Sequence, residues 1–460
     1  MNALVLKGLI YFTIIITVSI LVGWWADQYL ESQAAYMLAI LTAAALLWIT
    51  EIIPLFATSL LIIGAQILFL GNPGDWEIFK PTGSKSFHYS DFLDPISDPI
   101  VILFLGGFIL AKVGVTAGVD RHISAAVLGI FGHSAKKALI GVIVCTAVFG
   151  MWISNTATTV MMISLTTSLL MSVPKGNPYR KAITLAIPFA AGIGGIMTPI
   201  SSPPNAIAAG LLASNGIPIG FLQWMIVAIP LAAILLYILY LLLWQLYKPL
   251  QPLTLSPVAV KPFTRKGRFV VLIFSLTILL WMTDKVHGIP AAVVALFPLI
   301  MFTATRLLTV KDFNRIEWNI LFVIAGGLAL GYGINLTGLD IHIASMIPVN
   351  AEGIILIMFL ITLLMSTFLS NTTTAVLLIP MAISIALSSD NVHVKFMVFG
   401  LAMMCGSNMI LPISTPPNSI AYSTGELSKK DFALTGSIIA ICSLLLTYGY
   451  FWLLTYFNVW

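Results

Sequence analysis

Two short polar stretches stand inside long uncharged runs of the chain. The first is SNT in MWISNTATTV at residues 151–160, and the second is SNT in FLSNTTTAV, where the triplet occupies residues 370–372. An Asn side chain offers a carbonyl oxygen to a cation and an NH₂ group to a carboxylate, while hydroxyls serve either partner. The spacing therefore predicts two polar sites, centred on Asn155 and Asn371, that suit small ions.

A second pair of motifs interrupts two other apolar runs. TPISSPPNAIA at 198–208 and LPISTPPNSIA at 411–421 each carry two successive prolines, which block an α-helix. We expect an unwound loop at each motif, followed by a helix N-terminus whose partial positive charge suits an anion. Lys and Arg are absent from the surrounding segments, which are 138–174, 182–247, 353–389 and 396–425. An anion bound there would be held by dipoles, hydroxyls, amides and a bound cation.

Composition defines the class of protein. The 460 residues are 59% hydrophobic and 8% charged, with a mean hydropathy of +1.03, which is typical of an all-α polytopic membrane protein. The net charge of +5 then reports loop orientation and not nucleic-acid binding. No carboxylate pair, GxSxG or HExxH motif accompanies the polar stretches, so we expect no enzyme and no cofactor.

Eleven apolar runs approach or exceed the length of roughly 17–25 residues that spans a bilayer. They lie at about 8–25, 35–53, 54–71, 98–118, 182–213, 217–247, 269–284, 289–305, 317–336, 393–424 and 432–457. Two further uncharged runs, 138–174 and 353–389, each have SNT at their midpoint. Each predicts a helical hairpin with the triplet at its tip, although two full crossings would return the chain to the same face.

The basic residues indicate how these runs are oriented. With the N-terminus in the cytoplasm, 18 of the 22 Lys and Arg residues fall on the cytoplasmic side, and only Lys80, Lys85, Lys285 and Lys395 fall outside. Cytoplasmic loops of membrane proteins are enriched in Lys and Arg in this way. The pattern predicts a multi-pass protein of the cytoplasmic membrane with a cytoplasmic N-terminus and an external C-terminus.

Internal repetition divides the chain. Three motifs recur in the same order at separations of 213 to 220 residues, and the two copies would enter the membrane with opposite polarity. Inverted repeats with interrupted helices are typical of secondary transporters. We therefore expect N-terminal scaffold helices (1–97), a first inverted repeat (98–248), a cytoplasmic linker with scaffold helices (249–316) and a second inverted repeat (317–460).

The paired SNT tips, the paired PPN loops and WITEIIPL at 48–55 together resemble the divalent anion/sodium symporter family, in its di- and tricarboxylate branch, over nearly the whole chain. The resemblance implies a homodimer embedded in lipid, with a scaffold domain and a transport domain that moves as an elevator. It implies a dicarboxylate of the succinate, malate or 2-oxoglutarate class, with sulfate or a tricarboxylate as a remote alternative. The implied anion contacts are Ser154, Asn155, Thr156, Ser202, Pro203, Ser370, Asn371, Thr372, Thr415 and Pro416.

Sodium coupling is where the sequence departs from the family pattern. The resemblance implies a Na⁺ between each tip and the adjacent loop, with ligands among Ser154, Asn155, Ser201, Ser366, Ser370, Asn371 and Ser414. Ser366 stands one turn before the second triplet, but the equivalent residue before the first is Gly150, which has no side-chain oxygen. We expect Na⁺-coupled symport, with Na⁺-independent dicarboxylate exchange as the alternative.

Other interpretations of the polar stretches stay open. SNT at a helix midpoint also serves as a packing contact between membrane helices. Re-entrant hairpins also occur in ion channels, although inverted duplication favours alternating access. Counter-transport of labelled substrate distinguishes a carrier from a channel and from a membrane-embedded enzyme.

Overall fold

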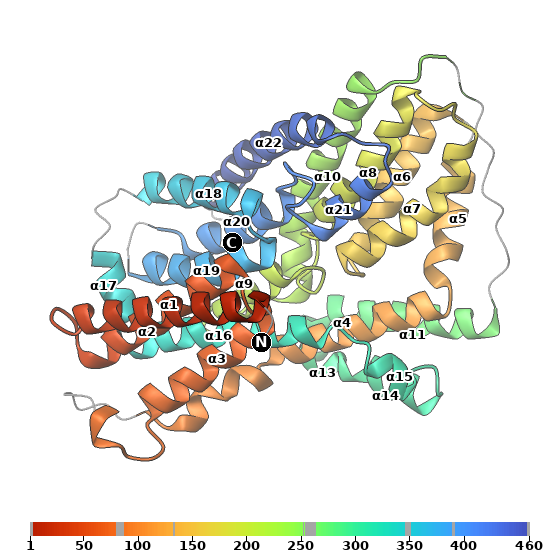
Figure 1. Cartoon of the computed structure of the whole chain (residues 1–460). Coiled ribbons are helices and arrows are strands. Elements are labelled where there is room, and N and C mark those ends of the chain that lie inside the picture. Colours follow the sequence, from red (N-terminus) through yellow and green to blue (C-terminus); the bar gives the residue numbers. More distant parts are fainter. Residues whose placement is uncertain are drawn as a thin grey trace.

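The structure is a computed structural model of the chain (Figure 1). It describes residues 3–79, 87–131, 134–251, 253, 264–345, 351–388 and 392–457. Every regular element in these ranges is helical, which confirms the all-α fold predicted from composition. Lys80, Lys85, the last residue of the run 353–389 and most of the linker after residue 251 lie outside the described residues.

Seven helices occur twice in the same order. The first set is α4 (Pro99–Thr116), α5 (Val119–Phe131), α6 (Ala135–Gly150), α7 (Asn155–Met171), α8 (Pro178–Gly194), α9 (Pro203–Ser214) and α10 (Phe221–Leu246). The second set is α16 (Trp318–Leu336), α17 (Leu339–Ser345), α18 (Ala351–Phe368), α19 (Asn371–Leu387), α20 (Val394–Ser407), α21 (Pro416–Ser423) and α22 (Lys429–Tyr456). The expected hairpins are the pairs α6–α7 and α18–α19. The expected interrupted helices are α8–α9 and α20–α21.

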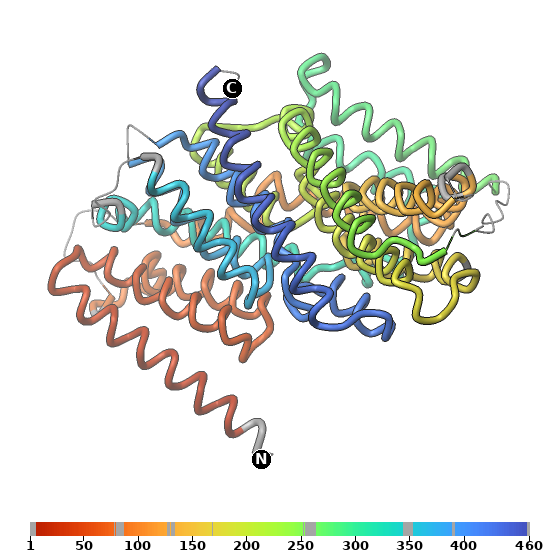
Figure 2. Tube along the Cα trace, turned by 90° about the horizontal axis from the view of Figure 1, so that it is seen from above, coloured from red at the N-terminus to blue at the C-terminus, as the bar shows by residue number. Residues whose placement is uncertain are grey.

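The remaining elements flank these two sets. Before the first set come α1 (Ala3–Ala26), α2 (Ser32–Thr50), α3 (Leu55–Gln66), η1 (Ile67–Gly71), η2 (Glu77–Phe79), η3 (Tyr89–Phe92) and η4 (Asp94–Ser97). Between the sets come α11 (Arg265–Met282), α12 (Asp284–His287), α13 (Ala291–Val294), α14 (Leu296–Ala304) and α15 (Val310–Phe313). Figure 2 shows α1 at the edge of the molecule, where it packs against α2.

Six segments among the described residues are long and apolar enough to cross a membrane, and they include α1, α2, α4, α10, α16 and α22. Several other expected spans are shorter helices, because prolines divide them. The run 182–213, for example, ends one helix at Gly194 and restarts at Pro203. Large apolar side chains on α1 and α11 are exposed, among them Leu272 and Leu279, as a lipid-facing surface requires.

The two sets exchange their restarted helices. The helix α9 packs against α19 and α20, while α21 packs against α7 and α8 (Figure 1). The middle of this arrangement is formed by α8 and α20, in which residues 182–194 and 396–407 are all buried. Because each restarted helix reaches the hairpin of the other set, both tips and both unwound loops meet at one place.

Candidate functional site

A cavity of about 260 Å³ lies where the two hairpin tips and the two unwound loops meet. Its lining includes all ten residues predicted to contact the anion, which are Ser154, Asn155, Thr156, Ser202, Pro203, Ser370, Asn371, Thr372, Thr415 and Pro416. Ser201 and Ser414, two of the predicted Na⁺ ligands, also line it, whereas the buried Ser366 does not. The structure thus gathers these residues, and their roles in binding stay a prediction.

The SNT triplets form the start of the second helix in each hairpin. Ser154 caps α7 by accepting a hydrogen bond from the Ala157 backbone N–H at 3.4 Å. Ser370 caps α19 in the same way, from Thr373 N–H at 3.1 Å. Ser is a favoured N-cap because its oxygen takes one of the N–H groups that the helix leaves unpaired. Each capping hydroxyl also has a side-chain partner, since Ser154 Oγ donates to Glu317 Oε1 at 3.4 Å and Ser370 Oγ lies 2.7 Å from Thr373 Oγ1.

The last residue of each PPN motif holds the unwound loop together. Asn205 Nδ2 donates to the carbonyl oxygens of Gly195 at 2.9 Å and Thr198 at 2.7 Å. Asn418 Nδ2 likewise donates to Met409 at 3.2 Å and Leu411 at 2.9 Å. Carbonyls that the break in the helix releases thus find donors inside the protein. Both asparagines belong to the predicted motifs, but this role could not be predicted from the residue pattern alone.

Several buried side-chain oxygens around the cavity have no hydrogen-bond partner in the described part of the chain. Asn155 Oδ1, Asn371 Oδ1 and Ser202 Oγ belong to residues that line the cavity. The Oδ1 atoms of Asn205, Asn408 and Asn418 belong to residues beside it that do not line it. The orientation of Asn205 follows from its partners, because only its NH₂ group can bond to two carbonyl oxygens. A buried acceptor without a donor is costly, and several around one cavity suit a cation. Their neutral character favours a weakly bound ion such as Na⁺.

The sodium prediction depended on two equivalent positions, Ser366 and Gly150, and these have different contacts in the structure. Ser366 Oγ donates to Thr362 O at 2.7 Å and accepts from Asn408 Nδ2 at 2.7 Å, so it supports the second tip from behind. A side chain at Gly150 would place its Cβ 2.7 Å from the backbone oxygen of Ala191. Gly150 is therefore required for close packing of α6 on α8, whatever its effect on a cation.

A carboxylate that sequence reasoning missed enters the same cavity. Glu317, the N-cap position of α16, is half-buried in the lining, and Ser154 Oγ donates to its Oε1 at 3.4 Å. In the sequence it appears only as the first residue of an apolar run. An anion in the cavity whose charge lay about 5 Å from this carboxylate would be repelled by about 3 kcal/mol at an effective dielectric constant of about 20. Glu317 is the one charged residue in the described lining.

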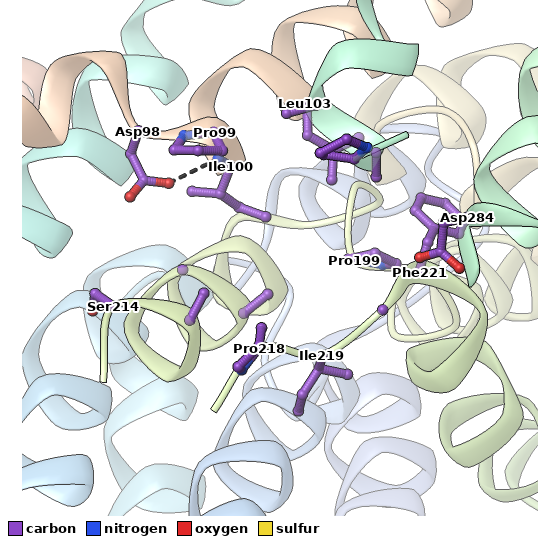
Figure 3. A pocket seen from close by; sticks show the side chains of 17 residues that line it. Asp98, Pro99, Ile100, Leu103, Pro199, Ser214, Pro218, Ile219, Phe221 and Asp284 are labelled. Carbon is purple, nitrogen blue, oxygen red and sulfur yellow. Dashed lines mark hydrogen bonds between the residues drawn. The ribbon is translucent and has the colours of Figure 1, made fainter. Parts of the chain in front are cut away.

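A larger cavity, about 440 Å³, lies against the first unwound loop (Figure 3). Its polar lining includes Asp98, which caps α4 by accepting from Ile100 N–H at 2.8 Å, and Asp284. Two carboxylates and a mostly apolar wall do not suit an anion. Pro199 lines this cavity and Ser201 lines the other, so a single short loop forms part of the wall of both.

Comparison with known proteins gives a family and several relatives. A family model described as the sodium:sulfate symporter transmembrane region matches residues 5–457. The sodium-dependent dicarboxylate transporter SdcS of Staphylococcus aureus (strain USA300) is 30% identical, over 95% of this chain and 89% of its own.

Two yeast relatives are longer. The inorganic phosphate transporter PHO87 of Saccharomyces cerevisiae is 28% identical over 95% of this chain and 49% of its own. An uncharacterized transporter of Schizosaccharomyces pombe is 31% identical over 86% and 46%, so the chain spans about half the length of each. Among solved structures, the YdaH transporter of Alcanivorax borkumensis is similar with a TM-score of 0.57 at 12% identity, covering 88% of this chain and 98% of its own. That likeness concerns the fold alone.

Proposed function

The chain belongs to the family of the sodium:sulfate symporter transmembrane region, and from this premise we propose that it is a secondary active transporter of dicarboxylates of the succinate, malate or 2-oxoglutarate class. Its family and relatives are membrane transporters and not enzymes. The relatives named SdcS support a dicarboxylate substrate. The relative PHO87 is named for inorganic phosphate, so phosphate is an alternative substrate, in addition to sulfate and tricarboxylates.

The observation that carries this proposal is the convergence of four helix N-termini on one cavity. The helices α7, α9, α19 and α21 all begin at residues of its lining, and no Lys, Arg or His is part of the described lining. Helix N-termini attract anions through their dipoles and free N–H groups. Two hairpin tips that line one cavity would each hold one carboxylate of a dicarboxylate through hydroxyl and amide donors.

We propose Na⁺ as the coupling ion. The sites would lie beside the tips, with Ser154, Asn155 and Ser201 at the first and Ser370, Asn371, Ser414 and the supporting Ser366 at the second. The unpartnered amide oxygens and the name of the SdcS relatives support this assignment. Na⁺-independent exchange of dicarboxylates is the alternative, and the missing hydroxyl at Gly150 favours it.

An elevator mechanism in a homodimer is the proposed route across the membrane. The short loop that lines both cavities supports alternating access, because a movement of this loop would change both cavities together. We propose that the hairpins and interrupted helices form the moving unit, and that residues 1–97 and 249–316 supply the scaffold. The proposed orientation keeps the N-terminus in the cytoplasm and the C-terminus outside.

Counterflow in proteoliposomes tests the proposal. Vesicles that hold the full-length protein and unlabelled succinate should take up labelled succinate transiently above equilibrium, with saturable kinetics. Uptake that needs Na⁺ on the same side would support symport, while equal counterflow in choline would support the exchanger. Uptake of labelled phosphate or sulfate but not succinate would overturn the proposed substrate class.

A further inference from the structure

We propose that Glu317 is a cation ligand, so that the first hairpin tip holds a monovalent cation with the help of a carboxylate that neither hairpin nor unwound loop provides. The inference rests on the proposed function, because it adds a ligand to the coupling-ion site proposed at the first tip. It also offers a replacement for the oxygen that Gly150 lacks.

The position of Glu317 supports this role. Its carboxylate reaches the cavity from the start of α16, and Ser154 Oγ is its hydrogen-bond partner at 3.4 Å. Asn155 Oδ1 and Ser202 Oγ, which belong to lining residues of the same cavity, are buried and have no partner among the described residues. One carboxylate with several neutral oxygens is a donor set for a hard cation and not for an anion.

Charge balance leads to the same conclusion. No Lys or Arg forms an ion pair with Glu317 in the part of the chain that the structure describes. Arg315 and Asp312, which are close to Glu317 in the sequence, belong to the turn and short helix before α16. Glu51 is another carboxylate, at the C-cap of α2. None of these lines the cavity, and the tips and loops carry no charge. A bound dianion would therefore face an uncompensated carboxylate unless a cation lies with it.

The consequence is a cation that connects two elements. Glu317 comes from α16 and Ser154 from the tip between α6 and α7, so a cation bound by both would hold this tip against α16. The affinity for that cation would depend on the position of the tip, since the carboxylate does not belong to it. Binding of the anion would in turn strengthen binding of the cation, and the reverse, by reciprocal coupling.

Thermal unfolding of the purified full-length protein, without any substrate, tests the cation site directly. In the wild type, Na⁺ should raise Tm over the same concentration of choline chloride, since an ion that binds only the folded state stabilises it. In Glu317→Gln, the concentration of Na⁺ needed for half of this rise should increase at least about tenfold, the loss expected for one charged ligand. Glu51→Gln, which removes a carboxylate outside the cavity, should leave the Na⁺ response unchanged. An unchanged response in Glu317→Gln would overturn the proposal.

Counterflow of labelled succinate gives the second readout. In Glu317→Gln, the Hill coefficient for the Na⁺ dependence of counterflow should be lower by about one, because one linked cation is lost. If the variant instead keeps its Na⁺ dependence and loses its dependence on pH, Glu317 carries a proton and the proposal is wrong. A wild type that shows the Na⁺-dependent rise in Tm but transports no succinate would contradict the proposed substrate and leave the cation site supported.

Discussion

The two halves bring the same motifs to one cavity but support them in different ways. Behind the second tip, Asn408 Nδ2 donates to Ser366 Oγ at 2.7 Å and to Thr367 Oγ1 at 2.8 Å, which ties the unwound loop to the hairpin. At the equivalent positions of the first half stand two glycines, Gly150 and Gly195. A polar network in one half thus corresponds to close backbone contact in the other.

This difference shows how a duplicated site loses a side chain without losing its shape. A Cβ at Gly195 would lie 2.5 Å from Asn155 Oδ1, so the amide of the first tip rests directly on the loop backbone. In the second half the residue equivalent to Gly195 is Asn408, and it is held by hydrogen bonds instead. The first tip is positioned by packing, which no longer needs the hydroxyl, and the second by directed polar contacts.

The largest expected effect tests whether both halves are needed. Asn155→Ala and Asn371→Ala each remove an amide from the cavity lining. A hydrogen bond to a charged group contributes about 1.5–3 kcal/mol, so succinate counterflow should fall at least about tenfold in each variant. Size-exclusion chromatography and Tm should show a folded protein, because neither amide oxygen has a hydrogen-bond partner among the described residues. If either variant transports at the wild-type rate, that half does not bind the substrate.

A second substitution targets the packing of the first half alone. Gly195→Ala would place its methyl group against the amide of Asn155, at 2.5 Å from Oδ1 and 2.6 Å from Nδ2. The backbone at Gly195 is right-handed, with φ −65°, so alanine itself is accommodated and the Asn155 side chain has to rotate. We expect a folded protein whose transport falls as far as that of Asn155→Ala.

Gly114→Ala is the matched control for this experiment. Gly114 lies inside α4, and a Cβ there would meet nothing within 4 Å. Alanine at such a position favours the helix slightly, by up to about 1 kcal/mol, and transport should not change. A Gly195→Ala variant that transports normally would show that the first tip does not depend on packing against the loop.

Much of the fold and of the cavity lining can be predicted from the sequence, because the SNT and PPN motifs each occur twice. The SNT and PPN pairs sit at matched positions, which identified the hairpins α6–α7 and α18–α19, the breaks at Pro203 and Pro416, and the set of residues that the cavity gathers. Proline chemistry and N-capping act locally, so residue type alone reveals them.

The contacts across the repeats could not be predicted in this way. Glu317 is not repeated, and it contacts Ser154, 163 residues away in the chain, only because the fold brings the start of α16 to the first tip. Gly195 and Asn408 share a position but not a residue type, so the motif search passed over both of them. Features that depend on tertiary approach leave no periodic signal in the sequence.

A third, smaller effect concerns the polar network of the second half. Asn408→Ala would leave Leu363 O, Ser366 Oγ and Thr367 Oγ1 without the donor that they share. Loss of a buried hydrogen-bond partner costs about 1–3 kcal/mol, so Tm in detergent should fall measurably, and more than in Asn215→Ala. Asn215 donates to Leu211 O at 2.8 Å near the end of α9 and is only partly buried. Equal shifts for the two variants would show that the network does not stabilise the second tip.

The smallest expected effect concerns an ion pair that joins the halves. Arg180, near the start of α8, donates to Glu426 Oε2 at 2.9 Å, while the equivalent residue of the second half is His393. The side-chain hydrogen bond from Arg180 lowers the pKa of Glu426. A carboxyl whose pKa is lowered by folding stabilises the protein above its unfolded pKa, about 4.3, and this contribution disappears as pH falls through the lower folded value.

Glu426→Gln should therefore lower Tm near neutral pH and make no difference at the acidic end, where the carboxyl is protonated. Because Glu426 is partly exposed, solvent weakens the pair, and the shift at pH 7 should be less than about 2 °C. Glu31→Gln, which changes an exposed carboxylate at the start of α2, should not shift Tm. If Glu426→Gln shifts Tm by the same amount at pH 4 and pH 7, the contact between the halves depends on packing of this side chain and not on its charge.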